Sequence, residues 1–201
     1  MGGILSIIIS LILFQVSDAL KLNWLGASVA GIVEEPEKIL TLLIVANNKK
    51  YRYTLNGLLF GAAIGIGFAA FEIAGYALYA GLVDPSPTGM MDSIMLRGML
   101  SPFGYIVWTG MCGAVLWRVK GNRKFQFSMF LDPRFTRIFF IAAIMHMTWN
   151  SPLYLPFYAK YAIIGVVAWI IIFGFIQDGL KQIKDEQISA LNESKIIKMS
   201  A

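Results

Sequence analysis

Long apolar segments constrain this chain more than any other feature of its sequence. A helix needs about 20 apolar residues to cross the hydrocarbon core of a bilayer. Of the 201 residues, 57% are hydrophobic and only 14% are charged, against roughly 25% charged in soluble domains. Six segments have the apolar character of membrane helices: Gly3–Ala19, Leu22–Ala46, Leu55–Val83, Ile94–Trp117, Phe135–Asn150 and Phe157–Gln177. The sequence therefore predicts an all-α, polytopic transmembrane bundle of about six helices.

These segments also predict the domain organisation. Residues 1–177 are expected to form a single transmembrane bundle, and 178–201 a charged C-terminal tail that is either a surface helix or frayed. Gly3–Ala19 lacks the basic region and the small-residue cleavage site of a signal peptide, so it is assigned as the first membrane helix; a cleaved signal peptide is the alternative. Cys112 is the sole cysteine, which excludes an intrachain disulfide.

The basic residues predict the orientation in the membrane. Thirteen Lys and Arg residues lie in the connectors 47–53 and 118–137 and in the tail, whereas the alternate connectors hold only Lys21 and Lys160. Because Lys and Arg are retained on the cytoplasmic side, both termini are predicted to be cytoplasmic. The same rule accounts for the net charge of +5, so no nucleic-acid partner is expected.

Several polar side chains lie within the predicted membrane helices. A charge at such a position costs roughly 2.5–3.5 kcal/mol to insert and usually faces the bundle interior with a functional role. A rise of about 1.5 Å per residue places Glu34, Glu72 and His146 all roughly 16–18 Å from a membrane surface. Equal depth on three helices predicts a shared site. The polar residues are Glu34, Glu35, Glu37, Lys38, Glu72, Arg97, His146 and Asn150.

Helical spacing predicts which faces these residues share. Small residues at every fourth position allow a second helix to approach closely, and Glu72 lies on the same face as such a stripe. Glu72 is therefore expected to point at a neighbouring helix. His146 and Asn150 are four residues apart and share a face, as do Glu34 and Lys38. The stripe consists of Gly57, Gly61 and Gly65.

Pro36 complicates the second predicted helix. It has no backbone N–H and disfavours helical geometry at Glu35. A kink or short break is expected at this point. Irregular backbone at membrane depth is tolerated only where it is buried in protein or faces water, so a hydrated cavity is predicted beside Glu34 and Glu35.

The pairing of adjacent glutamates with His-x-x-x-Asn indicates hydrolytic chemistry. A carboxylate beside a water molecule acts as a general base, and Glu34 or Glu35 is the candidate. A histidine and a carboxamide on one helical face, His146 and Asn150, can stabilise a developing oxyanion. Glu72 would support the base. These groups are what peptide-bond hydrolysis requires inside a bilayer.

At these residues the sequence resembles the PrsW family of intramembrane proteases, which is distantly similar to the CAAX-prenyl endopeptidase superfamily. The resemblance covers about 30–152 and consists of four short motifs in the expected order. They are Glu34-Glu35-Pro36-Glu37-Lys38, a glycine-rich run from Gly61 to Phe68-Ala69-Ala70-Phe71-Glu72, Arg97 followed by Ser101-Pro102, and His146-Met147-Thr148-Trp149-Asn150.

The resemblance implies an intramembrane endopeptidase in the plasma membrane of a prokaryote. Its substrate would be a membrane-anchored protein, such as a single-pass regulator, and the lipid bilayer would be its environment. Glu34, Glu35, Glu72, His146 and Asn150 are the implied catalytic residues, with Arg97, Tyr105 and Lys38 supporting them.

One departure from the family pattern bears on cofactors. The family usually has a histidine where Tyr105 stands, and this chain has no second histidine. Tyr105 can donate a hydrogen bond but is a poorer metal ligand. A zinc site made of glutamates and one histidine would lack the His- and Cys-rich ligands that zinc usually has. The sequence therefore favours a water molecule activated by glutamate without a metal, and no cofactor is expected.

Three alternatives remain open at this point. The chain could be a catalytically weakened relative of the family, because of Tyr105. It could be a small transporter or ligand-binding protein that uses its buried carboxylates for ions or protons, although no inverted repeat supports this. It could also be a scaffold that binds membrane partners through the glycine-rich face. The sequence makes no prediction of oligomeric state.

Overall fold

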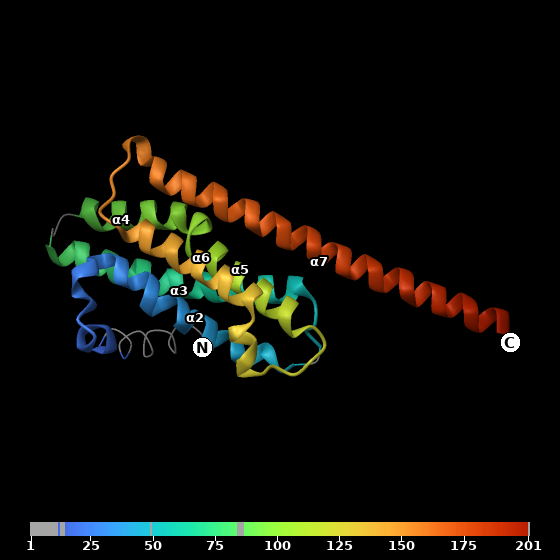
Figure 1. Cartoon of the computed structure of the whole chain (residues 1–201). Coiled ribbons are helices and arrows are strands. Elements are labelled where there is room, and N and C mark those ends of the chain that lie inside the picture. Colours follow the sequence, from blue (N-terminus) through green and yellow to red (C-terminus); the bar gives the residue numbers. More distant parts are fainter. Residues whose placement is uncertain (1–11, 13–14, 49, 84–86, 201) are drawn as a thin grey trace.

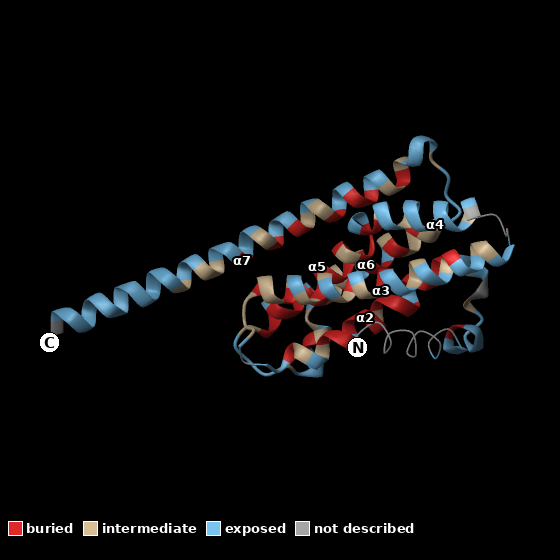
Figure 2. Cartoon of the chain, turned by 180° about the vertical axis from the view of Figure 1, so that it is seen from behind, coloured by how far each residue is buried: buried red, intermediate tan, exposed pale blue. Residues whose placement is uncertain are grey.

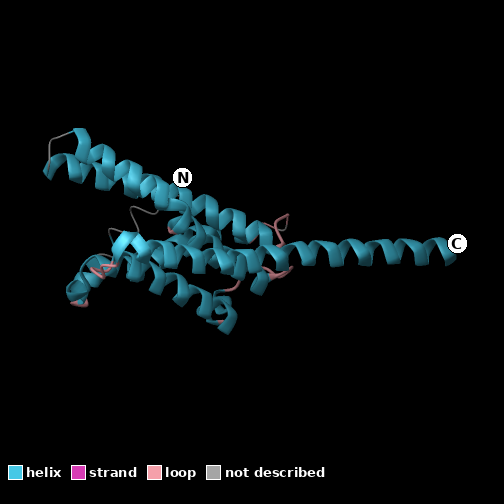
Figure 3. Cartoon of the chain, turned by 90° about the horizontal axis from the view of Figure 1, so that it is seen from above, coloured by secondary structure: helices cyan, strands magenta, loops and turns pink. Residues whose placement is uncertain are grey.

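The computed structural model describes residues 12, 15–48, 50–83 and 87–200 of the chain (Figure 1). Within these ranges all regular secondary structure is helical (Figure 3). From residue 22 on, the α-helices of the described chain are α2 (Ala30–Ala46), α3 (Thr54–Val83), α4 (Pro87–Leu100), α5 (Tyr105–Lys120), α6 (Pro133–Asn150) and α7 (Ala159–Ser200). The prediction of an all-α bundle is confirmed. The predicted first helix, Gly3–Ala19, lies largely outside the described residues.

Three stretches of the described chain are long and apolar enough to cross a membrane: Thr54–Val83, Thr88–Lys120 and Pro156–Met199. Many of their large apolar side chains are exposed on the outside of the bundle, among them Leu59 and Ile170 at 66% each. A polypeptide with so much apolar surface on long helices is stable in lipid rather than in water. The bundle is therefore a membrane domain.

Helix α5 is the centre of the bundle. It contacts α2, α3, α6 and α7, and nearly all of its residues are buried (Figure 2). Trp108, Met111, Cys112, Leu116 and Trp117 have no exposed surface. Because α5 touches α2, α3 and α6, which contribute most of the predicted site residues, it fixes the position of the site in the fold.

The glycine stripe of α3 packs against α5, as the spacing predicts. A Cβ atom added to Gly57, Gly61 or Gly65 would overlap the backbone carbonyl of Gly113, Thr109 or Tyr105, respectively. The backbones of α3 and α5 are therefore close enough that only glycine fits at these three positions. The stripe therefore sets the position of Tyr105, the first residue of α5.

Replacing Gly61 by Ala is expected to push α3 and α5 apart. The added methyl group meets backbone rather than a flexible side chain, so the midpoint of thermal unfolding in detergent should fall by about 2–12 °C. Gly67→Ala is the matched control on the same helix, because its Cβ would have no atom within 4 Å. Equal midpoints for the two variants would contradict this account of the packing.

The predicted fourth helix, Ile94–Trp117, is wrong as a single element. The chain forms α4, then a 3₁₀ turn at Ser101–Phe103, then α5, with Gly104 between them at φ −127° and ψ −104°. Pro102 cannot donate a backbone hydrogen bond, which disfavours a continuous helix, and Gly104 has non-helical dihedral angles. The break folds α4 against α3 and brings Arg97 near the start of α5.

The predicted second helix, Leu22–Ala46, begins later than expected. Leu22–Val29 is a 3₁₀ segment interrupted at Gly26, which has φ +54°, and α2 starts at Ala30. The expected break at Pro36 is wrong, because α2 runs through Pro36 as one helix. A proline removes only one helical hydrogen bond, and packing against neighbouring helices keeps the rest of the helix intact.

The other described boundaries agree with the sequence within a few residues, except at the end of α7. Helix α6 begins at a proline after Asp132, whose carboxylate accepts a hydrogen bond from the backbone N–H of Arg134 at 2.9 Å. Hydrogen bonds from Arg134 lower the pKa of Asp132 to about 2. This cap therefore contributes stability above the ordinary aspartate pKa and loses it as the pH falls through about 2.

Helix α7 continues through the predicted tail and projects beyond the bundle (Figure 1). The first part of the tail is fastened to the ends of α3 and α5. Arg118 donates to Asp178 at 2.5 Å, and the Gln182 side chain accepts from both the backbone N–H and the hydroxyl of Thr54 at 3.1 Å. The tail is thus helical rather than frayed.

Candidate active site

The site is built where α2 and α6 meet at close range. Gly31 faces α6, and a Cβ atom there would lie 2.7 Å from the carbonyl oxygen of Ala143 and 2.6 Å from the side chain of Met147. Only glycine allows this approach. One turn further along α2 the two glutamates come beside His146, the only histidine of the chain.

Glu35 is the most heavily bonded member of the site. Its Oε1 accepts a hydrogen bond from Lys38 Nζ at 2.8 Å and lies 2.8 Å from His146 Nδ1. All three side chains have no exposed surface. The Lys38 ammonium group also lies 4.2 Å from the centre of the Phe68 ring. Glu35 therefore joins a buried cation to the histidine and fixes the orientation of the imidazole.

Glu34 meets the opposite edge of the same imidazole. Its Oε2 lies 3.6 Å from His146 Nε2 and 3.8 Å from Lys38 Nζ. Neither Glu34 Oε2 nor His146 Nε2 has a hydrogen-bond partner among the described residues, although both atoms are buried. A water molecule can bridge two polar atoms that are too far apart for a direct bond. Glu34 and His146 therefore present a carboxylate oxygen and a ring nitrogen to one position.

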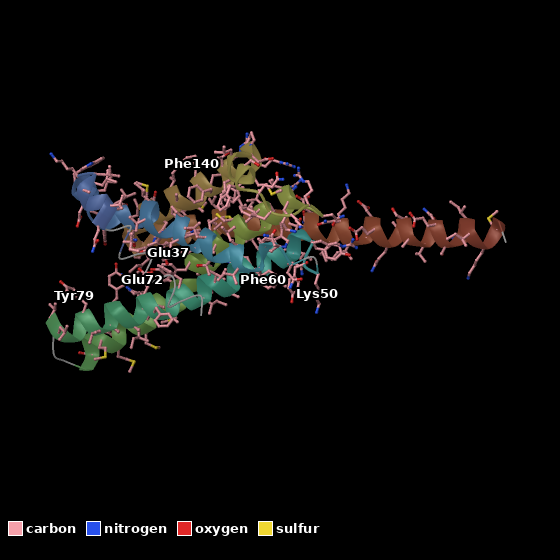
Figure 4. The ribbon with its side chains drawn as sticks, turned by 90° about the horizontal axis from the view of Figure 1, so that it is seen from below. Glu37, Lys50, Phe60, Glu72, Tyr79 and Phe140 are labelled. Carbon is pink, nitrogen blue, oxygen red and sulfur yellow. The ribbon has the colours of Figure 1, made fainter. Side chains whose placement is uncertain are left out.

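Glu72 lies beside Arg97 and Tyr105, and its carboxylate is also close enough to interact electrostatically with Glu34 and Lys38. Its carboxylate lies 3.7 Å from Arg97 Nη1, which donates to the Tyr105 hydroxyl at 3.3 Å. The Arg97 guanidinium also covers the face of Tyr76, 3.3 Å from the ring centre. Glu72 projects from α3, as Glu37 does from α2 (Figure 4). Glu72 points at neighbouring helices, as predicted, and its partners come from α4 and α5.

Tyr105 connects His146 with Arg97. The edge of its ring meets His146, with centroids 5.8 Å apart and planes at 88°. Its hydroxyl bonds Arg97. Tyr105 is 2% exposed, so it is a buried wall of the site.

Asn150 lies one turn beyond His146 on α6, at a cavity of about 290 Å³. Its amide nitrogen Nδ2 is buried and has no hydrogen-bond partner among the described residues. Arg97, Tyr105 and Trp149 also line this cavity. Glu34 and Glu35 are not among the residues that line this cavity, and the cavity predicted beside them stays a prediction.

Two aromatic residues that support the site were not predicted. The Trp108 ring packs on His146, with centroids 4.8 Å apart and planes at 31°, and Phe68 covers Lys38. Trp108 follows Tyr105 by one helical turn, and Phe68 precedes Glu72 by one turn. That spacing is the signal that could have identified them.

Comparison with known proteins places the chain in a family. The model of a family described as "PrsW family intramembrane metalloprotease" matches residues 1–176. The chain belongs to the PrsW family. No curated protein and no solved structure matches it at a significant level. The predicted resemblance is confirmed, and a PrsW-family chain is an intramembrane protease that acts on membrane-anchored proteins.

The family description names a metal, and the donor atoms of the site test that assignment. Catalytic zinc sites use three protein ligands at about 2.0–2.2 Å. Glu34 Oε2 and His146 Nε2, at 3.6 Å, are spaced as two ligands of one ion could be. Across the described ranges, no group of three His, Cys, Asp or Glu residues completes such a set. Lys38 Nζ brings a positive charge to within 3.8 Å of the same carboxylate. This donor set does not fit a three-ligand site, so we assign no step to a metal.

Proposed function

We propose that this PrsW-family chain hydrolyses peptide bonds of membrane-anchored proteins with a water molecule activated by Glu34. The observation that supports this most directly is the pair of buried, unpartnered atoms, Glu34 Oε2 and His146 Nε2, that face each other at 3.6 Å. A general base must lie within reach of the proton that it removes, directly or through one water. Glu35 Oε2 is likewise buried without a partner among the described residues, but Oε1 of the same carboxylate is already held by Lys38 and His146 Nδ1, so we assign the base to Glu34.

In the first step, Glu34 accepts a proton from the bridging water while the water oxygen attacks the carbonyl carbon of the substrate. The carbonyl oxygen becomes an oxyanion. When the tetrahedral intermediate collapses, the carbon–nitrogen bond breaks, and the protonated Glu34 returns its proton to the leaving nitrogen. Glu34 thus acts first as base and then as acid, and the balance is the addition of one water.

His146 and Asn150 are the proposed oxyanion donors. Glu35 accepts from His146 Nδ1–H and so turns Nε2 towards the reacting groups. In its protonated form His146 donates from Nε2, and the adjacent carboxylate of Glu35 balances the positive charge. Asn150 Nδ2 supplies a second donor. Buried, fixed donors stabilise the developing charge more than water does, because they need no reorganisation.

Glu72 has an indirect role in this proposal. Its ion pair with Arg97 holds the guanidinium that bonds Tyr105, and Tyr105 in turn packs on His146. Tyr105 thereby takes over part of the role of the second histidine that relatives usually have. We infer that Glu72, Arg97 and Lys38 position the reacting groups without contacting the substrate.

The cellular setting is also a proposal. The basic residues gather at the end of the bundle that carries the tail, which supports cytoplasmic termini. Membership of the family supports a prokaryotic plasma membrane and a single-pass regulatory substrate.

The test is cleavage by the purified protein in liposomes. A set of single-span peptides is added, and mass spectrometry identifies the two fragments of each. We expect at least one peptide to be cut within its apolar segment. If no peptide of the set is cleaved and the protein instead conducts ions in a way that Glu72→Gln abolishes, the chain is a transporter and this proposal is wrong.

Metal removal provides a separate prediction. Because the proposed steps use only side chains and water, dialysis against a strong zinc chelator should leave the cleavage rate within about twofold of its starting value. A soluble zinc protease treated in the same way is the control and should lose activity. Loss of cleavage that added Zn²⁺ restores would show that the family's metal takes part.

A further inference from the structure

The cavity at Asn150 has features that the proposed chemistry does not use. It measures about 290 Å³, at the lower end of the range for ligand pockets. An α-helix with its side chains is about 10–12 Å wide and does not fit such a space. One or two residues of an unwound chain do fit. The size of the cavity therefore suits a short extended piece of substrate.

The cavity lies beside the reacting groups. Tyr105 forms one wall and packs edge-on against His146. Trp149 forms another and packs on Trp108, which covers the same imidazole. Asn150 follows His146 by one helical turn, about 6 Å along the axis. A residue bound in the cavity is thus adjacent to the bond that Glu34 and His146 would act on.

The walls are mainly apolar and aromatic. Trp149 and Tyr161 meet edge to face at 4.5 Å, and Leu96 and Leu100 of α4 add aliphatic surface. Aromatic walls of this kind favour large apolar guests.

The one charged residue among the described residues that line the cavity, Arg97, already has interaction partners within the protein. Arg97 pairs with Glu72, bonds Tyr105 and lies over Tyr76. The positive charge of Arg97 is thus balanced by a neighbouring carboxylate, which weakens its attraction for an acidic side chain. This arrangement favours an apolar side chain over a carboxylate.

One polar atom of the wall lacks a partner. Asn150 Nδ2 is buried and forms no hydrogen bond to the described residues, and a buried amide donor in this state is unfavourable until a partner satisfies it. A backbone carbonyl oxygen of a bound peptide would satisfy it. The residue that offers this carbonyl would then have its side chain directed at the aromatic wall.

We propose that this cavity is a specificity subsite for a large aromatic or aliphatic side chain. It receives the residue that contributes the attacked carbonyl, on the N-terminal side of the cleaved bond, while Asn150 bonds that carbonyl. The inference rests on the proposed function and deepens it, because it names the substrate residue that the site selects.

The experiment uses single-span peptides of identical sequence except for one central residue, which is Phe, Leu, Ala or Asp. The wild-type protein in liposomes should cut after Phe or Leu with a kcat/KM about tenfold or more above that for Ala, and should cut poorly after Asp. Mass spectrometry of the N-terminal fragment identifies the residue before the cut.

Two variants separate this subsite from a general effect on the fold. Leu96 lines the cavity and is 44% exposed, so Leu96→Trp should fill the cavity with an indole ring. Met95 is the adjacent residue, is 53% exposed and does not line the cavity, so Met95→Trp adds the same ring outside it. Leu96→Trp should lower the Phe-to-Ala preference about tenfold while cleavage after Ala continues. Met95→Trp should leave the preference unchanged.

The outcomes distinguish the two proposals. If the wild-type protein cuts no peptide, the proposed function fails and the subsite with it. If it cuts the peptides with the same preference in the wild type and both variants, the proposed function stands and the subsite is wrong. Preferred cleavage after Asp would also overturn the subsite, because it would require Arg97 to be free to bind a carboxylate.

Discussion

Replacing Glu34 by Gln is expected to lower kcat for peptide cleavage by about 10³-fold and to leave KM within about threefold of the wild-type value. Glutamine has nearly the same shape but cannot accept the proton of the attacking water. The Glu34 side chain is only in loose contact with His146 and Lys38, so the fold should survive the change. The measurement is steady-state cleavage of a peptide identified in liposomes, with the unfolding midpoint recorded for each variant.

Glu37→Gln is the matched control, because it makes the same substitution at a buried carboxylate on the same helix. The carboxylates that contact the His146 ring are those of Glu34 and Glu35. Glu37→Gln should keep kcat within about threefold of wild type. The assignment of the base would be reversed if Glu34→Gln remained active and a stably folded Glu35→Gln were inactive. Residual activity in both would remove glutamate-activated water from the mechanism.

The sequence predicts helices well where apolar length and turn residues agree. Helix α3 was expected at Leu55–Val83 and extends over Thr54–Val83, because a long apolar run between polar connectors leaves little choice of boundary. The break at Gly104 was missed. The stretch Thr88–Lys120 is apolar enough on average to cross a membrane, and an average hydropathy does not report the effect of a single proline such as Pro102 on helix continuity.

Equal depth and helical phase were enough to bring Glu34 and His146 to one place, but not to separate Glu34 from Glu35. Adjacent helical residues point about 100° apart, so which of them reaches His146 Nδ1 depends on how α2 crosses α6. That crossing is set by the close approach at Gly31, which no pattern within α2 reveals. Pairwise geometry between helices is the information that a single sequence lacks.

Lys38→Met is expected to be the most destabilising single substitution in the site. It leaves the carboxylate of Glu35 fully buried without its 2.8 Å ammonium partner, and removal of one member of a buried ion pair costs about 3–5 kcal/mol. The free energy of unfolding in detergent should fall by that amount. Lys124→Met, at an exposed loop position, is the control and should unfold as the wild type does.

The double variant Glu35→Gln, Lys38→Met separates the structural role of this pair from its chemical role. Replacing both charges removes the unpaired ion, so most of the lost stability should return. The introduced carboxamide can still accept a hydrogen bond from His146 Nδ1, which preserves the orientation of the imidazole. It cannot balance a protonated imidazole, however, so cleavage should stay at least about tenfold below wild type despite the recovered fold. Full recovery of both stability and cleavage would mean that the Glu35 charge serves only to accommodate Lys38.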